Sequence, residues 1–155
     1  MRKLFFNSIA VLALLMPAVC LAESDCRFAL DIWGASHHFE RNKGYQEVNP
    51  GIGVRAYCGN WFVAADKVAH NSARGSTLAI GGGYRFPLTT VGEYALFFDA
   101  EAVHLNYKIP GKGDVRGWGA VPSFVIKRGA WSFDTAYVRA GRRGGVLLFF
   151  VERDF

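Results

Sequence analysis

The sequence predicts an all-β fold, an eight-stranded antiparallel up-and-down β-barrel that spans a membrane. Apolar and polar residues alternate through eight segments separated by turn residues, as they do in β-strands with two unlike faces. The charged residues lie mostly on the face opposite the large apolar ones, which is the distribution of a barrel embedded in lipid. Aromatic residues make up 15% of the chain, as expected if they form girdles at the membrane interfaces.

The N-terminal segment predicts export. A basic start precedes an apolar run at 4–19, and small residues favour cleavage after Ala22, so residues 1–22 are expected to be a signal peptide. Acylation of Cys20, as in a lipoprotein, is the alternative. Residues 23–155 then form one domain, the barrel. After the apolar run no stretch reaches the roughly 18 continuous apolar residues of a spanning helix, so the mature chain can enter a membrane only as a closed barrel.

The charge argues against nucleic acid as a partner. Of the 18 basic side chains, Arg2 and Lys3 lie in the signal peptide, which leaves 16 against 13 acidic ones. A net charge of about +3 is too small for a nucleic-acid-binding surface, but it suits anionic lipids.

The first two strands are expected at residues 27–39 and 51–58. In the first strand the even-numbered positions start with three apolar residues, and the odd-numbered positions carry most of the polar side chains. His37 is therefore expected on the polar, inward face and His38 on the opposite face. The second strand repeats this division, with Arg55 on its polar face.

Two cysteines remain after the signal peptide, Cys26 and Cys58. Antiparallel pairing of the first two strands places them opposite each other, at the base of the hairpin. In an oxidising compartment they would form a disulfide, and two unpaired thiols are the alternative.

The third and fourth strands are expected at 61–72 and 76–86, after a tight turn at 59–60. In the fourth strand, three successive glycines at 81–83 leave the inner face nearly bare of side chains. Glycines inside a strand indicate either a bend of the barrel or a place where another group packs against the backbone. Both interpretations stay open.

The fifth strand is expected at 93–107, after a predicted turn at 87–92, and it places Asp99 and Glu101 on one face. Paired carboxylates serve in general acid–base catalysis. Small barrels also fill their lumens with salt-bridged networks, and a network is the preferred interpretation. The basic residues available on the inward parity are Arg27, Arg55 and Arg85.

The last three strands follow a predicted loop at 108–115. Residues 116–127 and 131–139 form a hairpin, and 144–155 ends on an aromatic residue, which resembles the assembly signal of outer-membrane barrels. Pro122 interrupts the sixth strand, where it cannot donate a ladder hydrogen bond. We therefore expect a protein of the Gram-negative outer membrane. A soluble periplasmic barrel of the lipocalin type, with an apolar interior, is the alternative.

The sequence contains no metal or cofactor signature. The histidines lack the spacing of zinc ligands, and the glycine run lies inside a strand pattern instead of preceding a helix. What remains is His37 near the end of the first strand and the pair Asn71-Ser72 after the third. A histidine and a serine hydroxyl can support acyl transfer, with the imidazole moving the proton. Ordinary loop residues are the alternative interpretation.

The order of these features resembles the lipid A palmitoyltransferases, eight-stranded outer-membrane barrels that transfer an acyl chain from a phospholipid to lipid A. In that family a histidine late in the first strand precedes a Tyr-Asn-Glu-x-Pro loop and a glycine-rich strand. An Asp-Ser pair and, at a fixed distance, an Ile-Ala-Gly-Tyr-Gly-Trp strand follow. The matching positions here are His37, residues 45–47 (Tyr-Gln-Glu), residues 50–53 (Pro-Gly-Ile-Gly), Asn71-Ser72 and, without a gap, residues 79–84 (Ala-Ile-Gly-Gly-Gly-Tyr).

The resemblance covers residues 33–155 and implies a role for each matched position. These roles are His37 as the base, Ser72 as the catalytic hydroxyl, Asn71 as an orienting group, Gly83 as the floor of the acyl pocket, and Pro50 and Pro122 as points of lateral lipid access.

Three departures from the family pattern bear on activity. Asn71 replaces the aspartate, and an amide can orient a histidine without stabilising its charged form; in serine proteases that exchange costs about 10⁴ in rate. The loop at 45–47 matches only in part. The amphipathic N-terminal helix of the family is missing, because the first strand follows the expected cleavage site closely.

We therefore expect a monomeric, membrane-embedded barrel without cofactors that meets phospholipid and lipid A and carries a candidate site for acyl transfer or acyl hydrolysis at its outer rim. The alternative is a non-catalytic surface barrel with a structural or partner-binding role. A tapered apolar cavity beneath His37 would favour the enzyme. A lumen filled by Arg55, Arg85, Asp99 and Glu101 would favour the non-catalytic barrel.

Overall fold

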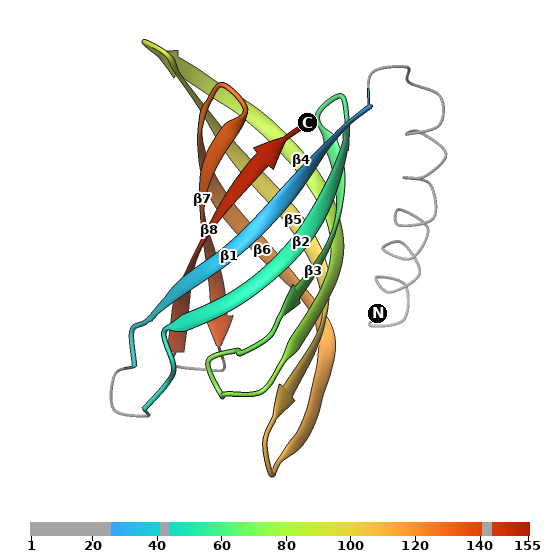
Figure 1. The fold of residues 1–155 in the computed structure, drawn as a ribbon, viewed down its shortest axis with the longest axis vertical. Helices are drawn as coiled ribbons and strands as arrows, with labels where there is room; N and C mark the ends of the chain where they lie inside the picture. Colours follow the sequence, from blue (N-terminus) through green and yellow to red (C-terminus); the bar gives the residue numbers. More distant parts are fainter. Residues whose placement is uncertain (1–25, 41–43, 141–143) are drawn as a thin grey trace, which may run out of the picture.

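The computed structural model describes residues 26–40, 44–140 and 144–155, and it confirms the predicted all-β fold. Eight antiparallel strands close into a barrel, in which each strand pairs with the next and the last pairs with the first (Figure 1). The strands are β1 Cys26–His38, β2 Val48–Cys58, β3 Trp61–Val68, β4 Thr77–Val91, β5 Tyr94–Ile109, β6 Gly113–Arg128, β7 Trp131–Ala140 and β8 Gly144–Asp154. The expected signal peptide lies outside the described residues.

No helix in the described part of the chain is long and apolar enough to cross a membrane.

The two ends of the barrel differ in their connections. At one end, here called the turn end, the hairpins close on Gly59, Gly92 and Gly129, whose positive φ angles of 59°, 60° and 59° suit glycine. The C-terminus lies at this end, and the opposite end carries most of the longer connections (Figure 1). We call the latter the loop end. The hairpin of β5 and β6 extends beyond the other connections there (Figure 1).

The turn predicted at 87–92 is wrong, because β4 continues to Val91. The ladder between β4 and β5 shifts register between Pro87 and Thr89. A bulge lets a strand continue past a proline, which has no N–H to donate. The reversal of the chain is therefore confined to Gly92 and Glu93.

The loop predicted at 108–115 is also largely strand. Pairing between β5 and β6 continues to Ile109 opposite Gly113. Gly111 and Gly113 have φ angles of 76° and 86°, which only glycine adopts readily, so the hairpin can close tightly. The third strand is shorter than predicted and ends at Val68.

A bulge in β1 reverses the expected orientation of the histidine pair. The ladders of β1 with both neighbours shift register between Trp33 and Ala35. Beyond the shift, Ser36 and His38 face the interior, with 4% and 6% exposure, whereas the His37 side chain is 35% exposed. Alternation alone cannot reveal one inserted residue, and such an insertion moves every later side chain to the opposite face.

The barrel is apolar outside and ionic inside. Many large apolar side chains that point outward are more than 40% exposed, whereas most carboxylates and two arginines of the strands are buried. The outward residues include Phe28, Ile32, Ile52, Val54, Leu78, Ile80, Phe86, Phe124, Ile126 and Phe133. This distribution is the reverse of a lipocalin-type interior.

The expected disulfide is present. Cys26 and Cys58 are register partners at the turn end of the β1–β2 ladder, with Cα atoms 4.4 Å apart, and their sulfur atoms are bonded. The bond closes a loop with a sequence separation of 32.

Replacing both cysteines by serine is expected to lower the free energy of unfolding by about 3 to 4 kcal/mol, because the unfolded chain regains the entropy that a loop of this size loses on closure. Urea titration of the protein in detergent micelles, followed by tryptophan fluorescence, measures this change. The reduced wild-type protein is the control and should match the double variant. Equal stability of oxidised wild type and variant would contradict the expectation.

Candidate functional site

The middle of the lumen is occupied by a cluster of buried ionic side chains. We call it the lumenal ionic cluster, and it consists of Asp31, Arg55, Arg85, Asp99, Glu101, Asp134 and Glu152. These residues come from β1, β2, β4, β5, β7 and β8, and none is more than 9% exposed. The network interpretation of Asp99 and Glu101 therefore agrees with the structure.

Two guanidinium groups link the carboxylates of the cluster. Arg55 donates from Nε to Asp31 at 2.7 Å and lies 3.7 Å from Glu101. Arg85 donates to both carboxylate oxygens of Asp99, at 2.7 to 3.1 Å, and to Glu152 at 3.2 Å. Each arginine thus connects strands on opposite sides of the barrel. Arg27, the third arginine considered from the sequence, pairs instead with Asp154 at the turn end.

Aromatic rings complete this layer of the lumen. Tyr57 donates a hydrogen bond from its hydroxyl to Glu152, and its ring packs 5.5 Å from that of Phe62. The Arg85 guanidinium lies 4.7 Å from the Tyr57 ring centroid. Tyr57 is 1% exposed and Phe62 0% exposed. These side chains and those of the cluster are almost wholly inaccessible to solvent and fill the barrel at this level.

Gly83 lies beneath the Phe62 ring. The two residues are partners in the β3–β4 ladder, and a Cβ atom on Gly83 would come within 2.8 Å of the Phe62 ring. Gly83 is therefore a place where another group packs against the backbone, one of the two interpretations left open by the sequence. In this structure an aromatic ring of the protein itself covers the position that the resemblance assigns to the acyl-pocket floor.

Asn71 anchors the connection between β3 and β4. Its side-chain nitrogen donates to the carbonyl oxygens of Ser76 and Lys108, at 3.0 and 2.9 Å. Its side-chain oxygen accepts from the backbone N–H groups of Ala73 and Gly75, both at 3.0 Å. Both ends of the amide are thus used to fix the loop.

Ser72 and His37 contact different residues. The Ser72 carbonyl accepts a hydrogen bond from the Gln46 N–H at 3.0 Å, and the backbone N–H of the next residue, Ala73, donates to the Tyr107 hydroxyl at 3.1 Å. His37 lies on the outer face, with Nδ1 3.8 Å from a Glu47 oxygen. Within the described ranges, no hydrogen bond joins His37 to Ser72 or Asn71. The structure does not assemble these three residues as a triad.

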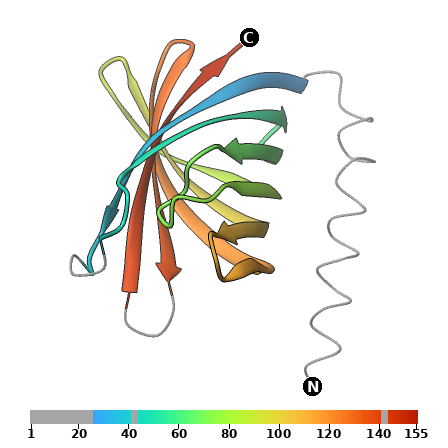
Figure 2. The ribbon, with the colours of Figure 1, turned by 60° about the horizontal axis from the view of Figure 1, so that its bottom comes forward.

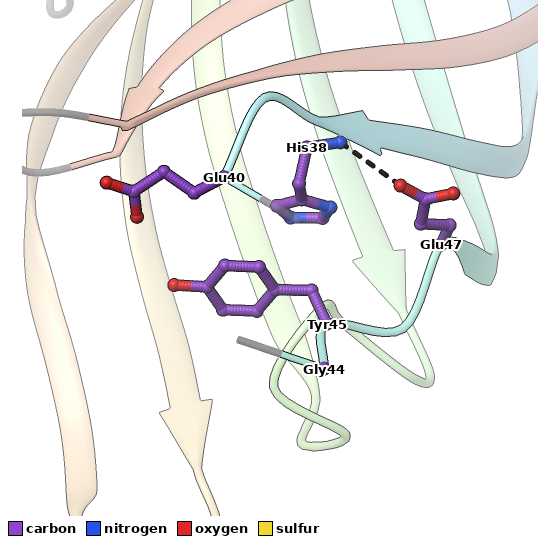
Figure 3. Close-up of a pocket in the computed structure, with 5 residues that line it drawn as sticks. All are labelled: His38, Glu40, Gly44, Tyr45 and Glu47. Atoms are coloured by element: carbon purple, nitrogen blue, oxygen red, sulfur yellow. Dashed lines mark hydrogen bonds between the residues drawn. The ribbon is translucent and has the colours of Figure 1, made fainter. Parts of the chain in front are cut away.

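The histidine that faces inward at the loop end is His38. It lines a pocket of about 390 Å³ together with Glu40, Gly44, Tyr45 and Glu47 (Figure 3). The rings of His38 and Tyr45 stack with their centroids 4.5 Å apart. The Glu47 carboxylate accepts a hydrogen bond from the backbone N–H of His38 at 3.3 Å. We call this the rim pocket. The sequence shows that these residues are present, but it does not predict the β1 bulge that turns His38 inward.

Both prolines of the predicted lateral access lie at interruptions of the ladder. Pro50 lies where β1–β2 pairing passes from Trp33–Gly51 to Ala35–Val48. Pro122 directly precedes the β6–β7 ladder, which covers residues 123–128 of β6.

Beyond Pro122 the loop-end part of β6 is unpaired on one side. Residues 113–122 of β6 face no partner on β7 among the described strands. The β5–β6 and β7–β8 hairpins diverge toward this end (Figure 2). A Cβ atom added at Gly117 or Gly119 would meet nothing within 4 Å, so the face of β6 at these glycines is also uncovered. The barrel is thus filled in the middle and open along one edge at the loop end.

The described residues contain no group of three or more His, Cys, Asp or Glu side chains that could hold a metal ion. Neither the scan against models of protein families nor the search of curated proteins finds a match to this chain. The fold and the site therefore define its class by themselves. It is a closed eight-stranded antiparallel β-barrel with an apolar exterior and a charged, filled lumen.

Replacing Arg85 by methionine is expected to lower the free energy of unfolding by about 3 to 5 kcal/mol, because Asp99 and Glu152 lose their buried partner. The matched control is Arg128→Met, whose exposed ion pair with Glu93 is expected to contribute about 1 kcal/mol or less. Urea unfolding in detergent micelles compares the two variants. A similar loss in both would show that the lumenal ionic cluster does not determine stability.

Proposed function

We propose that this protein is an integral outer-membrane barrel that is sealed against solutes and acts at its loop end. The observation that carries the proposal is the inverted distribution of side chains, with apolar residues outside and a filled ionic lumen inside. A soluble protein would expose this apolar belt to water, whereas a membrane barrel places it in hydrocarbon.

Export and orientation follow from the same features. The disulfide suits an oxidising compartment. The short turns and the C-terminus share one end, which we place in the periplasm, and the longer connections at the loop end then face the cell exterior. Lipids of the outer membrane, phospholipid and lipid A, would surround the barrel.

A sealed lumen excludes a role as a general pore. An eight-stranded barrel has an interior just wide enough for side chains to fill. Here Arg55, Arg85 and their carboxylates fill it, with exposures of 9% or less. A non-catalytic surface barrel, with a structural or partner-binding role, is the function that this geometry supports best.

Replacing Val54 by arginine is expected to impair membrane insertion. Val54 lies in the middle of β2, is 57% exposed and points outward. An arginine on the lipid face near the bilayer midplane costs about 2 to 4 kcal/mol. Insertion into lipid vesicles can be scored by the heat-dependent shift in gel mobility, with Val54→Leu as the control. Equal insertion of both variants would argue against a lipid-facing belt.

Vesicles that contain the wild-type protein are expected to show no solute uptake above that of empty vesicles. Swelling in sugar solutions, measured by light scattering, reports the uptake, and vesicles with a general porin provide the positive control. Porin-like swelling would contradict the sealed barrel.

Lipid acyl transfer or acyl hydrolysis is a second candidate function. It is favoured by one observation besides the resemblance, namely the ladder interruptions at Pro50 and Pro122, which are the expected points of lateral lipid entry. In this candidate His37 is the base, Ser72 the hydroxyl, Asn71 the orienting group and Gly83 the pocket floor. The absence of a hydrogen bond between His37 and Ser72 among the described residues and the Phe62 ring over Gly83 weigh against it.

If the second candidate holds, mass spectrometry of lipid A and phospholipids should show a change in acylation in cells that express the wild-type protein, and none with His37→Ala. A His38→Ala variant tests the inward histidine in parallel. Identical lipids in all strains, including one without the protein, would reject acyl chemistry and leave the non-catalytic barrel.

A further inference from the structure

We propose that the outer surface of the barrel at its turn end, around Arg153, binds the headgroup of an anionic phospholipid. Arg153 lies near the end of β8, and Figure 1 shows the C-terminus at the turn end. The inference rests on the proposed membrane barrel and goes beyond it, because it assigns a lipid class to a particular residue.

Arg153 lies at the edge of the apolar belt. Its register partners are Leu30 on β1 and Trp131 on β7, and Trp131 pairs in turn with Arg128 on β6. Two residues nearer the middle of the barrel, the same four strands carry only apolar side chains on their outer face. These are Ile32, Val151, Phe133 and Ile126. A ligand bound here can therefore place a charged group at the edge and a hydrocarbon chain against the belt.

Two aromatic rings hold the guanidinium group of Arg153 at this edge. The guanidinium carbon lies 5.1 Å from the ring centroid of Trp131 and 5.5 Å from that of Phe155. Both rings are exposed, by 46% and 76%. Tryptophan is favoured at the interface between membrane and water. A guanidinium group that stacks on a ring keeps its N–H donors, which lie in its own plane, available for another partner.

The positive charge of Arg153 is not neutralised by the protein. Its side chain is exposed and forms no ion pair with any residue that the structure describes. The neighbouring carboxylate, Asp154, is already bonded to two other basic side chains, Arg27 and Lys127. An anion from outside the chain can therefore pair with Arg153 without displacing a partner.

The charge around Arg153 favours an anion with one net negative charge. Arg128, the other cation of this row, lies 2.6 Å from a Glu93 oxygen, so this pair adds no net charge. A phosphodiester carries one negative charge and two free oxygens, and a guanidinium group can donate to both oxygens. Phosphatidylglycerol keeps this charge, whereas the quaternary ammonium group of phosphatidylcholine cancels it.

The apolar surroundings favour a phospholipid over a free anion. Phe133 and Ile126, in the adjacent row, are each 46% exposed. The acyl chain of a lipid whose headgroup pairs with Arg153 can lie along them, and a free phosphate makes no such contact. In the proposed orientation the turn end meets the periplasmic side of the membrane, where phospholipid headgroups are present.

The test uses the full mature protein, refolded in maltoside micelles, and titrates dihexanoyl phosphatidylglycerol against dihexanoyl phosphatidylcholine. The indole N–H signal of Trp131 in NMR spectra reports binding in every variant. Phosphatidylglycerol is expected to bind wild type about tenfold more tightly than phosphatidylcholine, the effect of one charge-assisted hydrogen bond. Arg153→Gln is expected to lose this preference, and Arg153→Lys, which keeps the charge without the planar fork, should keep part of it.

Arg139→Gln is the matched control. Arg139 is an exposed arginine near the loop end of β7, so its removal changes the net charge equally and should leave the preference intact. The heat-dependent shift in gel mobility checks that each variant is folded. Equal affinity of wild type for the two lipids would overturn the proposal, as would the same preference in Arg153→Gln and Arg139→Gln.

Insertion into lipid vesicles separates this proposal from the membrane barrel on which it rests. A protein that inserts but shows no preference for phosphatidylglycerol would refute the headgroup site alone. A wild-type protein that does not insert would refute both.

Discussion

Two buried arginines hold the interior of this barrel together. Arg55 on β2 and Arg85 on β4 contact carboxylates from β1, β5, β7 and β8, so that opposite walls are joined across the lumen. The charged side chains of the interior thus bring strands from several parts of the barrel wall into contact. Buried ions remain stable only when they are paired. The same side chains fill the middle of the lumen.

The loop end carries unsatisfied groups, as does the lumenal ionic cluster, where Asp31 Oδ1 and both carboxylate oxygens of Asp134 have no described hydrogen-bond partner. The edge of β6 at residues 113–122 lacks a described neighbour, and the side chains of Ser36, His38 and Asn49 include buried atoms without described partners. Burying a polar group without a hydrogen-bond partner costs free energy. The turn end, in contrast, is fixed by the disulfide and by tight glycine turns. The turn end is thus covalently fixed, whereas the loop end retains an unpaired strand edge.

Much of the fold could be predicted because strands have a period of two. Eight alternating segments, the disulfide and the inward parity of Arg55, Arg85 and Asp99 all follow from that period, and the structure confirms them. The candidate site was harder to predict. Asn71 was considered an orienting group for a histidine, yet its amide is used entirely to hold a loop. Hydrogen-bond partners that depend on loop geometry are not encoded in residue spacing.

The sequence by itself determined the class of the fold and which residues are charged, because both depend on local order along the chain. Only the tertiary structure decided which histidine faces inward, since a single bulge between Trp33 and Ala35 exchanges the two faces of β1. It also decided that Phe62 covers Gly83 and which carboxylates each arginine reaches. Those contacts depend on the stagger of the strands around the closed barrel. The alternation of residues along the sequence does not determine that stagger.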